Sequence, residues 1–202
     1  MLTLFHAPQS RSSRLVWLVE ELGADCRIEY CTIRRIDGTG AADPRNPHPD
    51  GKVPALLHGD ALITECAAVA LYLNGLHPQA GLGFDAASPQ RGPLLTWICW
   101  AAGELEPAVF ARMTGETQTN PYWQARYDAC VSRLLEALWN GPYLMGDGFT
   151  VADVMIGSTL AWSRAHLPES PTIDAYLARL AERPAYRRAM MRDGGEVIEQ
   201  AA

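Results

Sequence analysis

Residues 2–23, LTLFHAPQSRSSRLVWLVEELG, join a short apolar segment to an amphipathic one through a polar turn. Four aliphatic side chains of the second segment follow the i, i+3, i+4, i+7 spacing of one helix face: Leu15, Leu18, Val19 and Leu22. Gly23 comes next, and glycine ends helices readily because it tolerates a left-handed backbone. The stretch therefore predicts a strand at residues 2–5, a turn at residues 6–10 and a helix that stops at Gly23.

Three further elements complete the first part of the chain. Alternation, β-branched content and tight-turn residues place them: a strand at residues 27–36, a hairpin of residues 53–57 and 61–64, and a helix capped by Thr64. A loop rich in glycine and proline, residues 37–51, separates the second strand from the hairpin. This order of strands and helices predicts an α/β domain over residues 1–77.

The remainder of the chain is predicted to be helical. Residues 78–89 are rich in proline, glycine and alanine, which is typical of a linker. From residue 90 to residue 202 the apolar side chains recur at helical spacing, and no strand pattern appears. Thr150-Val-Ala-Asp153 has the spacing of a capping box at the start of a buried helix. We therefore expect a linker at residues 78–89 and an all-helical domain at residues 90–202.

Composition limits the partners and the compartment. The chain has 202 residues, of which 17 are Lys or Arg and 23 are Asp or Glu, giving a net charge of -6. Nucleic acid and anionic membranes need clustered positive charge, so neither is the expected partner. The longest apolar stretch, residues 94–102, is too short to cross a membrane. The N-terminus lacks the pattern of a secretion signal, and we expect a cytoplasmic protein.

The cysteines support the same compartment. There are five, an odd number, and none forms a C-x-x-C pair. Such cysteines are typical of a reducing environment, where most are small buried side chains. Cys26 and Cys31 have opposite parity on one predicted strand and should face opposite sides of the sheet. No metal site is predicted.

Three features of the first part of the chain could bind or activate a small molecule. Ser10 lies just before a helix, where unpaired amides favour an anion, although its simplest role is helix capping. A cis Val53-Pro54 bond would expose the backbone of Val53 to an extended peptide, whereas a trans proline would merely start a strand. Glu65 begins a helix and could accept from an ammonium group or simply offset the helix dipole.

Together these features resemble the glutathione S-transferase family, and the resemblance covers nearly the whole chain. Four segments match its motifs in order: residues 4–14 its first strand and catalytic turn, residues 51–56 its cis-proline motif, residues 62–69 its γ-glutamyl-binding motif, and residues 148–153 the buried capping box of its helical domain. The resemblance implies a thioredoxin-like first domain that binds glutathione. It also implies a helical-bundle second domain that supplies a wall for the electrophile, and a homodimer.

The resemblance assigns roles to residues of the first domain. Ser10 best matches the serine that stabilises the glutathione thiolate, and Ser12 is the alternative because the loop register can shift. Val53 would pair its backbone with the cysteinyl part of glutathione, beside a cis Pro54. The remaining implied contacts are Glu65 and Cys66 for the γ-glutamyl end and Lys52 for a carboxylate.

Two parts of this assignment depart from the family or stay open. Cys66 stands where a serine is usual, and a thiol is the weaker hydrogen-bond donor. No motif chooses among the basic residues that could bind the glycyl carboxylate: Arg34, Arg35, Arg45 and His48. On the helical domain the residues expected to border the electrophile are Trp100, Ala101 and Glu104.

The implied function is the conjugation of glutathione, as co-substrate, to small hydrophobic electrophiles in detoxification. One alternative is a glutathione-dependent disulfide reductase or peroxidase, in which the same thiolate attacks sulfur or oxygen. Another is a non-catalytic interaction protein on the same fold. The catalytic turn has no cysteine, which weakens any mechanism that needs a mixed disulfide with the protein at that position.

Overall fold

The computed structural model describes residues 1–194. The chain forms two compact units, one of Met1–Ala80 together with the segment from Arg183 onward, and one of Gly81–Glu182. The end of the predicted helical domain, residues 195–202, lies outside the described residues. The last described helix therefore belongs to the first unit by its packing, although its sequence follows the helical part of the chain.

The first unit is built on a four-stranded sheet in the order β2-β1-β3-β4. Its strands are β1 (Leu2–His6), β2 (Cys26–Tyr30), β3 (Ala55–His58) and β4 (Ala61–Thr64). β1 and β2 are parallel, whereas the pairs β1–β3 and β3–β4 are antiparallel. β1 has a strand on each side and four of its five residues are buried, which explains its nearly continuous apolar sequence.

β2 is shorter than the predicted strand at residues 27–36. Its last ladder pair joins His6 to Tyr30, and the amide of Cys31 then donates to the carbonyl of His6 at 2.9 Å. β1 ends there, so the residues after Cys31 have no partner strand and continue as loop. As predicted, residues 37–51 form turns and bends without a helix or strand.

Two helices of the first unit begin close to the predicted site. α1 (Ser13–Leu22) ends at Gly23, whose φ of 58° confirms the left-handed cap. α2 (Cys66–Leu76) has Glu65 as its N-cap residue, so the prediction that Thr64 caps this helix was wrong. Thr64 instead pairs with Ala55 as the last residue of β4, and the helix begins two residues later at Cys66.

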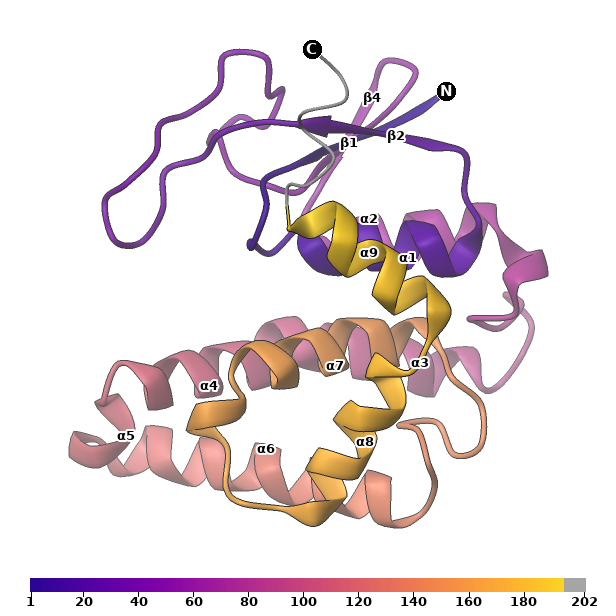
Figure 1. The fold of residues 1–202 in the computed structure, drawn as a ribbon. Helices are drawn as coiled ribbons and strands as arrows, with labels where there is room; N and C mark the ends of the chain where they lie inside the picture. The colour runs from indigo at the N-terminus through magenta and orange to yellow at the C-terminus, as the bar shows by residue number, and fades with distance from the viewer. Residues whose placement is uncertain (195–202) are drawn as a thin grey trace. The chain divides into compact units, whose positions relative to one another are not determined.

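The final helix, α9 (Pro184–Asp193), packs along α1 (Figure 1). The ring of Trp17 meets Tyr186 edge-on at 4.9 Å between centroids. Arginines at or near α9 pair with two acidic residues of α1. Arg183 donates two hydrogen bonds to the carboxylate of Glu21, at 2.6 and 2.7 Å. Arg188 and Arg192 pair with Glu20, so these arginines help to hold α9 on α1.

The second unit is all-helical. Its elements are α3 (Arg91–Trp100), a π-helical turn (Ala101–Leu105), α4 (Glu106–Met113), α5 (Glu116–Thr119), α6 (Pro121–Trp139), α7 (Val151–Trp162) and α8 (Pro171–Ala181). The π-helical turn precedes Pro107, which has no amide to donate to the carbonyl of Gly103. Arg126 of α6 donates to that carbonyl at 2.7 Å and satisfies it.

The predicted capping box at the start of α7 is confirmed. The hydroxyl of Thr150 accepts from the amide of Ala152, and the carboxylate of Asp153 accepts from the amide of Thr150 at 2.8 Å. Asp153 is fully buried and also accepts from the hydroxyl of Tyr176 in α8 at 3.0 Å. The motif therefore caps one helix and ties it to another.

Candidate functional site

Ser10 lies in the turn between β1 and α1, and its side chain is half-buried. Its hydroxyl donates to the carbonyl of Ala7 at 2.6 Å and lies 2.9 Å from the hydroxyl oxygen of Ser12. The amide of Ser12 in turn donates to the Ser10 hydroxyl oxygen at 3.2 Å. The Ser10 hydroxyl is therefore fixed in place at the helix N-terminus, in a residue that is only half-buried.

Ser12, the alternative to Ser10, is fully buried. Its hydroxyl oxygen lies 2.7 Å from Nδ1 of His6 and accepts from the amide of Ala7 at 3.3 Å. It is the N-cap residue of α1 but makes no side-chain capping bond, so simple capping does not explain it. Because Ser12 has no exposed surface, its hydroxyl contacts only residues of the protein interior.

A carboxylate from the other end of the chain holds the turn together. Oδ1 of Asp193, in α9, accepts from the hydroxyl of Ser13 at 2.6 Å and from the amide of Gln9 at 3.1 Å. Gln9 has a φ of 53°, a left-handed conformation that strains a residue with a side chain. Sequence reasoning missed Asp193, because nothing near it in the chain indicates that α9 reaches the turn.

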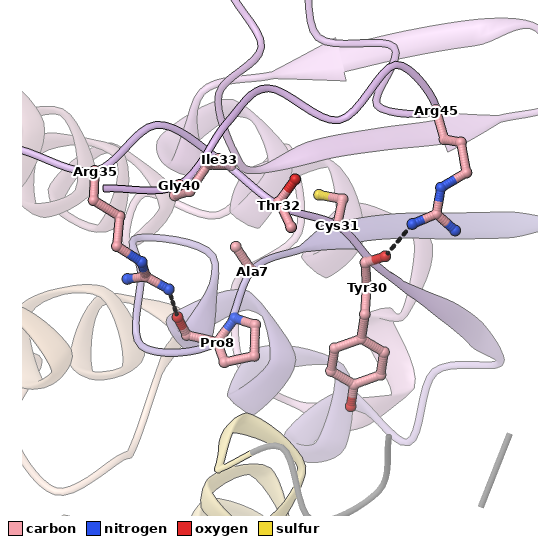
Figure 2. A pocket seen from close by; sticks show the side chains of 9 residues that line it. All are labelled: Ala7, Pro8, Tyr30, Cys31, Thr32, Ile33, Arg35, Gly40 and Arg45. Atoms are coloured by element: carbon pink, nitrogen blue, oxygen red, sulfur yellow. Dashed lines mark hydrogen bonds between the residues drawn. The ribbon is translucent and has the colours of Figure 1, made fainter. Parts of the chain in front are cut away.

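Arg35 supports the same turn from the loop after β2. Its guanidinium group donates to the carbonyl of Pro8 at 2.8 Å and to that of Gln9 at 3.3 Å, the first of which Figure 2 shows. A hollow of about 280 Å³ lies beside these contacts. It is lined by Ala7, Pro8, Tyr30, Cys31, Thr32, Ile33, Arg35, Gly40 and Arg45.

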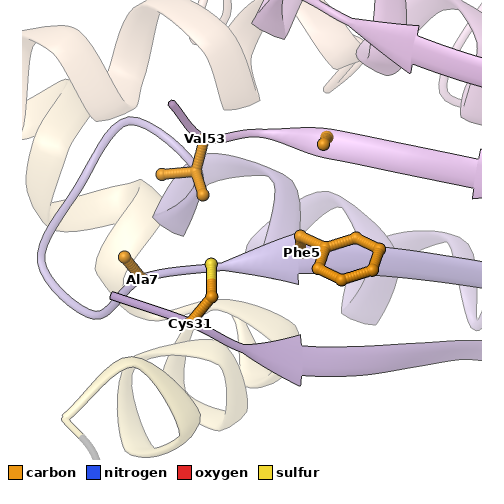
Figure 3. Packing of buried hydrophobic residues seen from close by; sticks show 5 residues of the cluster. Phe5, Ala7, Cys31 and Val53 are labelled. Carbon is orange, nitrogen blue, oxygen red and sulfur yellow. The ribbon is translucent and has the colours of Figure 1, made fainter. Parts of the chain in front are cut away.

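The Val53-Pro54 peptide bond is cis. Val53 is buried against Ala7 and Cys31 in one apolar cluster, which sets this turn beside the start of the turn between β1 and α1 (Figure 3). Among the described residues, no hydrogen bond reaches the amide or carbonyl of Val53. Its backbone can therefore pair with an added extended segment.

The start of α2 meets the same turn. Cys66 is buried, and its thiol donates to the carbonyl of Arg11 at 3.5 Å, a residue next to Ser10. Glu65 is exposed and has a φ of 68°, the second strained non-glycine residue of the site besides Gln9. The turn between β1 and α1, the cis-proline turn and the α2 N-terminus thus lie together, as three separate sequence features predicted.

The basic candidates differ in how far they are already engaged. Arg45 pairs with Asp43 at 2.8 Å and with Glu29 at 3.1 Å, and its hydrogen bonds lower the pKa of Asp43 to about 2. Lys52 is 70% exposed and pairs with Asp50 at 3.2 Å. His48 is buried and accepts from the amide of Asp50. Arg34 is exposed and makes no hydrogen bond or ion pair within the described part of the chain.

The three residues expected to border the electrophile lie on α3 and the π-helical turn. Trp100 and Glu104 line a surface hollow of about 510 Å³ on the helical unit, next to Arg133 of α6. The guanidinium of Arg133 stacks over the Trp100 ring at 4.7 Å from its centroid. Ala101 is fully buried and does not line this hollow.

Residues 1–194 hold neither a cluster of metal-ligating side chains nor a membrane-spanning helix. No group of three or more His, Cys, Asp or Glu side chains is arranged to hold a metal ion in that part of the chain. No described helix is long and apolar enough to cross a membrane.

Both units match known families along most of their length. The N-terminal domain model of glutathione S-transferases matches residues 1–75, and the C-terminal domain model matches residues 83–188. The first unit is thus a thioredoxin-like domain with its cis-proline turn, followed by the helical domain of the same fold. This chain belongs to the glutathione S-transferase family.

Individual relatives agree over nearly the whole chain. Glutathione S-transferase GstA of Escherichia coli O157:H7 is 27% identical over 197 residues, which cover 95% of this chain and 98% of the relative. A glutathione transferase structure from Methylococcus capsulatus is 28% identical, with a TM-score of 0.78, and covers 96% of this chain and 99% of that one. A sphingomonad glutathione S-transferase complexed with glutathione is 25% identical, with a TM-score of 0.79 and coverage of 95% and 98%.

Proposed function

We propose that this protein conjugates glutathione to small hydrophobic electrophiles, with Ser10 stabilising the glutathione thiolate. The observation that carries the proposal is the convergence of three elements on one turn. The half-buried Ser10 hydroxyl, the unpaired backbone of Val53 and the start of α2 at Glu65 and Cys66 all lie there. A glutathione-bound relative supports the choice of ligand.

The roles follow from the chemistry of the tripeptide. The backbone of Val53, beside Pro54, pairs with the cysteinyl residue and sets its sulfur near Ser10. Glu65 accepts from the γ-glutamyl ammonium group, and the amides at the start of α2, with Cys66, face its carboxylate. Lys52 and Arg34 are exposed cations that could bind the glycyl carboxylate. Of these two, only Lys52 would have to give up an ion pair, the one with Asp50, to do so.

The structure favours Ser10 over Ser12 as the residue at the sulfur, because Ser12 has no exposed surface. A free cysteine thiol has a pKa of about 8.5, so only a few per cent of it is ionised at neutral pH. A hydroxyl donor and the amides of a helix N-terminus favour the charged form. A shift of ~2 units corresponds to about 2.7 kcal/mol and makes most of the bound thiol nucleophilic.

For the electrophile we propose contacts with Trp100 and Glu104 on the helical unit. An aromatic face suits an aromatic or other apolar substrate. Ala101 is fully buried, so we do not propose that it touches the electrophile. The homodimer and the cytoplasmic location stay predictions from the resemblance and the composition.

The deciding experiment combines glutathione binding with the pH dependence of conjugation to a chloronitrobenzene. We expect the wild type to bind glutathione, and Ser10→Ala to lower the rate at pH 7 by about 20-fold, because the thiolate fraction falls. Ser132→Ala, at an exposed serine of α6, is the matched control and should keep the wild-type profile.

Three outcomes would contradict the proposal or a part of it. A wild type that does not bind glutathione would exclude every glutathione-dependent reaction at this site. A wild type that binds glutathione but turns over only a mixed disulfide or a hydroperoxide would replace conjugation with the reductase or peroxidase alternative. An unchanged pH profile in Ser10→Ala would move the thiolate contact away from Ser10.

A further inference from the structure

The last residue of β1 is a histidine without a role in the proposed glutathione contacts. His6 is fully buried, and a buried imidazole needs polar partners to offset the loss of water. Its two ring nitrogens face different elements. Nδ1 lies 2.7 Å from the hydroxyl oxygen of Ser12, and Nε2 lies 3.2 Å from Oδ1 of Asp193 in α9, within ion-pair range.

These contacts continue outward to the accessible surface of the turn. The Ser12 hydroxyl oxygen lies 2.9 Å from that of Ser10, and Ser10 is half-buried. Each oxygen is also held by a backbone amide, that of Ala7 at 3.3 Å for Ser12 and that of Ser12 at 3.2 Å for Ser10. A hydroxyl has one hydrogen to donate and two lone pairs. Ser10 can therefore still donate to Ser12, and Ser12 can donate to Nδ1 of His6.

We propose that His6 is the proton acceptor for the glutathione thiol, reached through the hydroxyl groups of Ser10 and Ser12, and that Asp193 stabilises the imidazolium that results. This inference rests on the proposed function, in which the thiol sulfur lies against Ser10. His6 does not touch the sulfur, so it acts only through the two hydroxyl groups.

The proton transfer balances without any other reactant. The S–H bond breaks, and its proton goes to the hydroxyl oxygen of Ser10 while the electron pair stays on sulfur. The original hydrogen of Ser10 moves to the oxygen of Ser12, and the original hydrogen of Ser12 moves to Nδ1 of His6. Both serines remain neutral, and the products are a thiolate and an imidazolium whose Nε2 lies 3.2 Å from Oδ1 of Asp193, within ion-pair range of the carboxylate.

The end state suits both the thiolate and the imidazolium. The Ser10 hydroxyl now donates to the thiolate, as the proposed function requires. In the structure without ligand it donates to the carbonyl of Ala7 at 2.6 Å, a bond that it exchanges when the sulfur arrives. The titratable groups in contact with the imidazole, among the described residues, are Asp193 of α9 and Tyr30 of β2, whose ring meets it edge-on at 5.5 Å between centroids.

The ionisation of bound glutathione tests the proton acceptor directly. The ultraviolet absorbance of the thiolate should be followed against pH in the wild type, in His6→Gln and in Ser12→Ala. We expect His6→Gln to shift the midpoint upward by about one pH unit, because it removes the positive charge that favours the anion. Ser12→Ala should shift it in the same direction, because the Nδ1–H of the buried imidazolium then lacks its acceptor. His58→Gln, at a histidine of β3 that bonds Tyr72 at 2.7 Å, is the matched control and should leave the midpoint unchanged.

A second measurement does not depend on how the variants fold. The ¹⁵N shifts of the His6 imidazole are recorded at pH 7 for the wild type alone, with glutathione and with S-methylglutathione. We expect Nδ1 to become protonated with glutathione but not with S-methylglutathione, which has no thiol proton to give.

The outcomes separate this inference from the proposed function. If neither glutathione nor its S-methyl analogue binds, the proposed function fails and the proton acceptor fails with it. If glutathione binds and ionises while the His6 shifts are the same with both ligands, the proposed function stands and the role of His6 is overturned. A thiolate midpoint unchanged in both His6→Gln and Ser12→Ala, each shown to be folded by circular dichroism, would overturn it equally.

Discussion

Asp153 and Asp193 are both buried carboxylates that accept several hydrogen bonds, and they lie in different units of the chain. The donors to Asp153 are all neutral: the amides of Leu144 and Thr150 and the hydroxyls of Thr150 and Tyr176. Asp193 accepts from an amide and a hydroxyl and also faces the imidazole of His6.

The same residue type therefore has opposite electrostatics in the two places. Burial raises the pKa of Asp153 above its ordinary value, and its four neutral donors only partly reverse that shift. Burial also acts to raise the pKa of Asp193, but the contacts with His6, Ser13 and the Gln9 amide outweigh it and leave the pKa lowered. Neutral donors hold a structural carboxylate, whereas a histidine partner makes a carboxylate suited to stabilising charge.

The largest expected effect is the loss of folding stability when Asp153 is replaced. Asp153→Ala removes the cap of α7 and leaves buried donors unpaired, so we expect it to lower the free energy of unfolding by about 3 kcal/mol. Urea denaturation measures the loss. Asp147→Ala, at an exposed aspartate of the preceding loop, is the control and should stay within about 0.5 kcal/mol of the wild type. A loss as small as that of the control would contradict the structural role.

The Asp193→Asn variant should cost less, about 1.5 kcal/mol at pH 7. The amide oxygen can still accept from Ser13 and Gln9, and only the charge of the carboxylate is lost. Asp25→Asn, at an exposed aspartate of the same unit, is the matched control. The pH dependence of conjugation should change in Asp193→Asn as well. If stability fell while that dependence stayed as in the wild type, Asp193 would be as purely structural as Asp153.

The pH dependence of stability should have opposite signs for the two carboxylates. Asp193 has a lowered native pKa, so its contribution is present above the unfolded value of about 3.9 and is lost as pH falls through the native pKa. Asp153 has a raised native pKa, so the native state takes up its proton first and gains stability as pH falls toward about 3.9.

Denaturation curves between about pH 3 and pH 7 test these signs. As pH falls, the difference in unfolding free energy between wild type and Asp193→Asn should shrink, and the difference between wild type and Asp153→Asn should grow. Two differences that move in the same direction would remove the electrostatic contrast between the two sites.

The smallest effect is expected where the contact is neutral and weak. Cys66→Ser replaces a thiol that donates to the Arg11 carbonyl at 3.5 Å. A hydroxyl is the stronger donor, but its side chain reaches less far toward that carbonyl. We expect the free energy of unfolding to change by less than about 1 kcal/mol and the affinity for glutathione to change by about threefold or less. Calorimetric titration measures the affinity, and Cys99→Ser, at an exposed thiol, is the control. A much larger loss of binding would show that the sulfur itself is required.

The contrast between the two aspartates also shows which features the sequence could predict. Thr150 and Asp153 are three residues apart, so their capping box is visible as a local pattern and was confirmed. The hairpin, the glycine that ends α1 and the convergence of Ser10, Val53 and Cys66 were predicted in the same way, from local signals in the right order.

The errors arose where one segment meets another. The strand after α1 was predicted too long, because its length depends on where β1 stops offering partners, at His6. The pairing of the arginines around α9 with α1 was not predicted, because helical spacing shows which side chains share a face but not what that face meets. The π-helical turn before Pro107 was hidden in the same way, since Arg126 satisfies the free carbonyl from another helix.

The sequence by itself determined the order of the elements, the end of α1 at Gly23, the capped start of α7 and the serines of the turn, because these depend on backbone preferences and on side chains a few residues apart. Only the tertiary structure decided that Ser12 is buried, that Ser10 is accessible and that His6 lies between Ser12 and Asp193. The physical reason is distance along the chain. The amide of Gln9 and the carboxylate of Asp193 are 184 residues apart, and no local propensity encodes their contact. That contact exists only once α9 packs on α1 and the ion pairs between the two helices fix its position.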